Sequence, residues 1–106
     1  LYCELPLTFP QLALGTEVEA PVLGGKARLK VPPGTQPGEI LRLKGKGMPG
    51  LRGRGRGDAC YQAVLEIPTR LTAKQRELLE AYQRASTDES GPLLASFLER
   101  MKKLLG

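Results

Sequence analysis

Apolar and polar residues alternate over the first part of the chain, a pattern that is typical of half-buried β-strands. Within residues 2–9 the apolar face consists of Cys3, Leu5, Leu7 and Phe9. Pro6 stands on the opposite face and favours an edge position, because proline cannot donate a main-chain hydrogen bond to a neighbouring strand. Residues 11–14 are expected to form one helical turn, which Gly15 would close.

Two alternating segments meet at Gly24 and Gly25, which predicts a β-hairpin with these glycines as its two-residue turn. Counting outward from that turn places three pairs on one face: Val22 with Ala27, Ala20 with Leu29, and Val18 with Val31. On the other face Glu19 would lie opposite Lys30, so opposite charges would meet across the strands. Pattern, turn and charge therefore predict the same hairpin.

Two more strands are expected before residue 70. Residues 32–38 are rich in proline and glycine, which predicts a rigid connection. The short strand that follows would direct Leu41 and Leu43 inward. The last strand begins at Asp58 and would carry on one face Tyr61, Ala63, Leu65 and Ile67.

After Pro68 the apolar period changes to that of a helix. Thr72 followed by Gln75 is a capping-box pattern, which predicts a helix over residues 73–85. Pro92 suits the first turn of a second helix over residues 92–105, with an apolar stripe of Leu94, Phe97, Leu98, Met101, Leu104 and Leu105. We therefore predict a mainly β fold, in which a small antiparallel β-sandwich-like domain (residues 1–70) precedes two C-terminal α-helices (residues 71–106).

The composition narrows the possible functions. The 106 residues contain no histidine, so the commonest metal ligand and the usual general base at neutral pH are both missing. No nucleophile stands beside a base and no carboxylates form a credible pair, so we expect no enzyme, no metal and no cofactor. Cys3 and Cys60 are too far apart in sequence for a redox or zinc motif, and are expected to be reduced, partly buried thiols.

Three further expectations follow from the sequence. The net charge of +5 is compatible with an acidic partner but does not establish one. No apolar stretch is long enough to cross a membrane, so a cytoplasmic protein is expected. The first residues already have the pattern of a strand, without an initiator methionine or signal peptide, so the chain is expected to be part of a larger protein.

Residues 44–57 form a basic, glycine-rich segment that we expect to be a long exposed loop. Residues 45–50 have the spacing G-x-G-x-x-G, but no helix is predicted after them, so a dinucleotide site is not expected. The cations of this loop could contact phosphates, although it has no aromatic residue on which bases could stack. An RNA-binding β-domain that uses this loop is one alternative function.

Several spaced motifs occur in a characteristic order: Leu5-Pro6-Leu7-Thr8-Phe9, Ala13-Leu14-Gly15, residues 31–38 (VPPGTQPG), residues 42–49 (RLKGKGMP) and Gly57-Asp58. Pro68-Thr69, Leu71-Thr72, Gln75 and Leu78-Leu79 extend the pattern into the first helix. Together they resemble the second C-terminal β-domain of the DnaJ family of bacterial co-chaperones. Ala59 and Cys60 stand where the family usually has larger aliphatic residues, a departure that concerns packing.

The resemblance implies a protein that captures unfolded polypeptides, called clients, dimerises through its C-terminal end, and delivers clients to the ATPase chaperone DnaK. The family's J-domain needs a His-Pro-Asp loop, and some members carry zinc-binding CxxCxGxG repeats; this chain contains neither. Contact with DnaK would therefore belong to other parts of the parent protein.

In the family, clients lie in a shallow apolar groove between the first two strands of the preceding sister domain, of which this domain resembles a repeat. The resemblance thus implies a groove lined here by Cys3, Leu5, Val18, Ala20 and Val22. The alternative is that these are ordinary core residues.

For the second C-terminal helix the resemblance implies dimerisation, with five residues buried between two chains: Leu94, Phe97, Leu98, Met101 and Leu105. A purely structural dimerisation module, without client contact, is a further alternative.

High salt should weaken phosphate contacts but should change apolar peptide capture little. The salt dependence of binding therefore separates RNA binding from the other functions.

Overall fold

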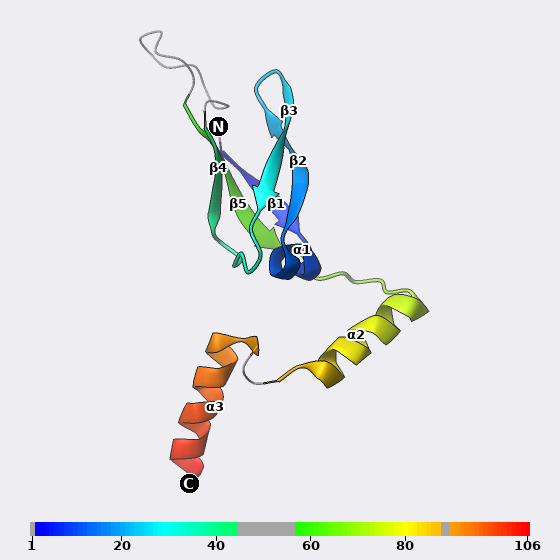
Figure 1. Ribbon diagram of the computed structural model, residues 1–106, viewed down its shortest axis with the longest axis vertical. Coiled ribbons are helices and arrows are strands. Elements are labelled where there is room, and N and C mark those ends of the chain that lie inside the picture. Colours follow the sequence, from blue (N-terminus) through cyan, green and yellow to red (C-terminus); the bar gives the residue numbers. More distant parts are fainter. Residues whose placement is uncertain (1, 45–56, 88–89) are drawn as a thin grey trace. The chain divides into compact units, whose positions relative to one another are not determined.

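The computed structural model describes residues 2–44, 57–87 and 90–106 (Figure 1). The chain divides into two units, residues 1–68 and residues 69–106. The first unit holds all of the described strands and a short helix, and the second holds two longer helices.

The strands of the first unit form two sheets. A three-stranded sheet has the order β1-β5-β4, from β1 (Tyr2–Leu7), β5 (Ala59–Leu65) and β4 (Ile40–Leu43). The hairpin of β2 (Thr16–Val22) and β3 (Gly25–Val31) forms the second sheet. β1 runs parallel to β5, while the other pairs are antiparallel. The predicted mainly β fold with C-terminal helices is confirmed.

Helix α1 (Phe9–Leu14) begins earlier than the sequence pattern predicts. Thr8 caps it with a reciprocal pair of bonds, since the Gln11 N–H donates to Thr8 Oγ1 (3.3 Å) and the Thr8 N–H donates to Gln11 Oε1 (2.9 Å). Pro10 lies in the first turn, where its missing N–H costs no helical bond. The extension of the first strand to Phe9 was therefore wrong, because this cap ends β1 at Leu7.

The hairpin forms, but its register differs from the prediction by two residues. Val22 lies opposite Gly25, so the turn is Leu23-Gly24, and Val18 lies opposite Leu29 rather than Val31. The reason is the turn geometry: Gly24 has a φ of +85° at the second central position, which a non-glycine residue would adopt only under strain. Because side chains alternate with a period of two, a shift of two leaves each of them on its predicted face.

The charged face of the hairpin carries opposite charges, as predicted, but between other partners. Glu19 lies opposite Arg28 rather than Lys30. The ion pairs are diagonal, from Arg28 to Glu17 (2.8 Å) and from Lys26 to Glu19 (3.7 Å).

The buried side chains between the two sheets form two adjoining clusters. Leu7, Leu12, Val31 and Ala63 make the first, and Ala20, Leu29, Ala59 and Tyr61 make the second. Leu41 packs against both clusters and Leu43 against the second, which confirms their predicted inward direction. Ile67 was predicted to share the buried face of β5, but the strand ends at Leu65 and Ile67 is 67% exposed.

The second unit contains α2 (Ala73–Ala85) and α3 (Pro92–Leu105). Thr72 and Gln75 form the expected capping box at the start of α2, with bonds of 2.9 and 3.1 Å. Pro92 lies in the first turn of α3. No residue of either helix is buried.

Candidate functional site

Strand β1 lies at one edge of the three-stranded sheet, with β4 at the other, and β2 belongs to the hairpin sheet (Figure 1). β1 and β2 belong to different sheets, so they are not paired with each other. These two strands carry the residues for which the sequence predicted a polypeptide-binding groove.

The structure brings four of these five residues together. Cys3 and Leu5 of β1 and Val18 of β2 are half-buried and pack against the cluster that contains Ala20. Ala20 itself has no exposed surface, so in this conformation it belongs to the core against which the other three pack. Val22 is half-buried at the turn end of β2 and lies outside both clusters.

The outer edge of β2 presents main-chain groups that no described strand engages. In an antiparallel pair, residues that exchange hydrogen bonds alternate with residues that do not. Pro21 has no N–H and cannot exchange bonds with Lys26, so Pro21 belongs to the second kind. Because the two kinds alternate, Glu17 and Glu19 also do not exchange hydrogen bonds with the residues opposite them. Their N–H and C=O groups therefore point away from β3.

The outer edge of β1 is similar. The Glu66 N–H donates to the Leu7 C=O (2.9 Å), so Leu7 directs its main-chain groups toward β5. By alternation Glu4 and Pro6 direct theirs away from β5. β1 is an edge of its sheet, as Pro6 predicted. Two strand edges with unengaged main-chain groups thus border the half-buried apolar residues.

Tyr61 holds the hairpin to the three-stranded sheet. Its ring is completely buried, and its hydroxyl donates a hydrogen bond of 2.5 Å to the C=O of Pro21. Burial, and then the nearby thiols of Cys3 and Cys60, raise the pKa of this hydroxyl above 10.0, so it remains a donor at neutral pH. The sequence placed Tyr61 on the inner face of its strand but carried no signal for this bond, which joins residues 40 positions apart.

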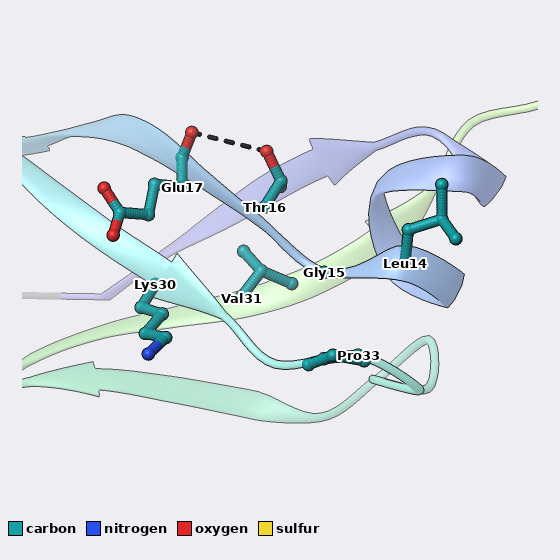
Figure 2. A pocket seen from close by; sticks show the side chains of 7 residues that line it. All are labelled: Leu14, Gly15, Thr16, Glu17, Lys30, Val31 and Pro33. Atoms are coloured by element: carbon teal, nitrogen blue, oxygen red, sulfur yellow. Dashed lines mark hydrogen bonds between the residues drawn. The ribbon is translucent and has the colours of Figure 1, made fainter.

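A shallow hollow of about 310 Å³ lies where β2 and β3 meet the end of α1 (Figure 2). Its lining residues are Leu14, Gly15, Thr16, Glu17, Lys30, Val31 and Pro33. Gly15 is required here, because its φ is +80° and an added Cβ would lie 2.9 Å from the Pro33 ring. The sequence pattern carries no signal for this hollow, since it forms where three separate segments meet.

The predicted dimerisation stripe is an exposed apolar surface on α3. Phe97 is 50% exposed and Leu105 is 81% exposed, and Leu94 and Met101 are also exposed, while Leu98 is half-buried. A second hollow, of about 280 Å³, lies along the same helix between Phe97, Arg100, Met101 and Leu104. The structure therefore places the stripe at the surface.

Other predicted features have simpler outcomes. Cys3 and Cys60 are free, half-buried thiols, as expected. Within residues 2–44, 57–87 and 90–106, no helix is long and apolar enough to cross a membrane, and no group of three acidic or cysteine side chains could hold a metal ion. Most of the basic segment 44–57 lies outside the described residues, as does the G-x-G-x-x-G stretch within it.

Residues 1–68 match the family model of the DnaJ C-terminal domain. The chain belongs to the DnaJ family. It is 46% identical over 103 residues to the chaperone protein DnaJ of Caldicellulosiruptor bescii, covering 97% of this chain and 26% of that protein. It is 44% identical over 104 residues to the DnaJ of Syntrophotalea carbinolica, covering 98% of this chain and 28% of that one. The DnaJ of Opitutus terrae is 48% identical over 103 residues, covering 97% and 27%.

The chain thus spans about a quarter of the length of these DnaJ proteins. Their similarity extends beyond the matched β-domain, because it covers nearly all of the chain, the two C-terminal helices included. Membership of DnaJ, a family of chaperones, confirms the expectation that this chain is not an enzyme.

Proposed function

We propose that residues 1–70 bind unfolded polypeptide between β1 and β2 and that α3 joins two copies of the chain. The observation that carries this proposal is that two unpaired strand edges border the half-buried side chains of Cys3, Leu5 and Val18. Such a surface can accept an extended chain through main-chain bonds and apolar contacts together.

This arrangement suits a client of variable sequence. Main-chain N–H and C=O groups are the same in every polypeptide, so pairing with a strand edge carries little sequence information. The apolar side chains between β1 and β2 then favour clients with exposed hydrophobic residues, which unfolded chains provide. Val22, at the turn end of β2, would extend this contact.

Dimerisation is proposed for the stripe of Leu94, Phe97, Leu98, Met101 and Leu105. It is largely exposed on an amphipathic helix, and a second copy of α3 would cover it with apolar side chains of the same kind. The basic residues of the last turn, Lys102 and Lys103, lie off the stripe, so such an interface would not bury their charges.

At the level of the whole protein we propose a cytoplasmic co-chaperone. Its remaining parts, outside this chain, would contact DnaK and pass bound clients to it.

The test is a two-dimensional NMR titration of the 106-residue chain with a short synthetic peptide that has leucine at alternate positions, preceded by light scattering. We expect shifts concentrated at Leu5, Val18 and Val22, little changed between low and high salt, and the mass of a dimer. An unchanged spectrum would contradict client binding by this domain, and would leave dimerisation as its function. Affinity that disappears at high salt would instead favour contacts with the basic segment 44–57.

A further inference from the structure

The outer edge of β2, one of the two strand edges that border the proposed binding surface, is interrupted at both ends. By the alternation described above, the residues that direct their main-chain groups outward are Glu17 and Glu19 within β2, with Gly15 and Pro21 on either side of them. A main-chain N–H or C=O at these positions is available to a client only where it is not already hydrogen-bonded within the chain.

Pro21 closes the edge at the turn end. It has no N–H to donate, and its C=O already accepts the Tyr61 hydroxyl at 2.5 Å. Because Tyr61 is completely buried in the core, this bond is held in place by the packing of the whole unit. A client strand therefore finds neither a donor nor an unengaged acceptor at Pro21.

Gly15 closes the edge at the other end. Its N–H donates to the Gln11 C=O at 3.0 Å and so ends α1. Next to it, the Thr16 hydroxyl donates to the Glu17 C=O at 3.4 Å, a long bond that a better donor could replace (Figure 2). Among the contacts of the described residues, none engages the N–H groups of Glu17 and Glu19, which are therefore the available donors along this edge.

We propose that a client pairs with β2 only over the segment Glu17–Glu19, and that Pro21 and Gly15 set the limits of this segment. This inference rests on the proposed client binding and adds the register in which a client strand would pair with β2. A segment this short would leave most of a bound polypeptide unpaired, so the client would be held by few main-chain bonds and would dissociate readily.

Pro37 provides a matched control. It is exposed, as Pro21 is, but it lies in the connection between β3 and β4 and belongs to neither β1 nor β2. Pro21→Ala restores a donor on the edge of β2, whereas Pro37→Ala makes the same substitution outside both edges. Neither substitution removes a buried side chain.

The experiment measures amide hydrogen exchange by NMR on the 106-residue chain, with the same leucine peptide at about ten times its dissociation constant. Exchange at Glu17 and Glu19 is expected to slow by about tenfold, while Gly15, already bonded, stays unchanged. In Pro21→Ala the new amide at position 21 should also become protected, and the peptide should bind about fivefold tighter, as one added hydrogen bond allows. Pro37→Ala should bind as the parent chain does.

The outcomes separate the two proposals. If the peptide does not bind at all, the proposed function fails and the register fails with it. If the peptide binds but protects amides other than Glu17 and Glu19, or if Pro21→Ala binds the peptide no tighter than Pro37→Ala does, only the register is overturned.

Discussion

In residues 2–68 the apolar side chains of β1, β2, β3 and β5 are buried against one another, whereas in α2 and α3 no residue is buried. The contrast is sharp for aromatic residues, since Tyr61 has no exposed surface and Phe97 is 50% exposed. Both units have the amphipathic patterns that predict their elements. The β-unit buries its apolar face within the chain, whereas the two helices leave theirs exposed.

The largest effect is expected on dimerisation, from a substitution in the exposed apolar stripe of α3. Phe97→Glu places a carboxylate in the centre of the proposed interface, and twofold symmetry places a second one beside it. Since an unpaired buried charge costs several kcal/mol, the dissociation constant of the dimer should rise at least about a hundredfold. Light scattering should then give the mass of one chain. Ser96→Glu, which adds the same charge to an exposed position off the stripe, should leave the dimer intact.

The next effect concerns the β-unit, where Val18 is half-buried and serves both the core and the proposed groove. Val18→Thr keeps the branched shape but adds a hydroxyl, and should weaken peptide affinity by about tenfold, a cost of roughly 1.4 kcal/mol. Titration calorimetry would measure it. Ile40→Thr, on the exposed side of β4, is the control and should bind peptide normally. Equal affinity in all three proteins would mean that Val18 is only a core residue.

Sequence patterns predicted the elements of both units but not how some of them meet. Caps are local, so Thr72 and Gln75 were enough to place the start of α2. Periodicity found the faces of the hairpin, yet it cannot distinguish registers that differ by two residues, and the turn chemistry of Gly24 decided between them.

The candidate site was predictable to the same degree. Its half-buried residues Cys3, Leu5 and Val18 followed from alternation and the family resemblance. The complete burial of Ala20 and the bond from Tyr61 to Pro21 did not, because both depend on how the two sheets pack.

A smaller effect tests the bond that joins the sheets. Tyr61→Phe removes only the hydroxyl and should lower the free energy of unfolding by about 1 kcal/mol, the usual contribution of one such hydrogen bond. Tyr2→Phe is a close control, because its hydroxyl donates to Gln62 Oε1 (3.0 Å) at an exposed site, where water can replace the bond. Urea unfolding at neutral pH would compare the two. Equal losses would mean that burial adds nothing to the Tyr61 bond.

The last prediction concerns the same hydroxyl at alkaline pH. Burial raises the pKa of Tyr61 in the folded chain above the value of 10.0 expected when unfolded. Above pH 10 the unfolded chain therefore loses this proton before the folded chain does, so the stability that Tyr61 contributes is complete below pH 10 and is lost as the pH rises through the folded pKa. All other groups are common to the parent chain and Tyr61→Phe, so their contributions cancel in the comparison. The stability difference between the two proteins should consequently narrow above pH 10, whereas a difference that is constant with pH would mean that the hydroxyl titrates alike in the folded and unfolded chains.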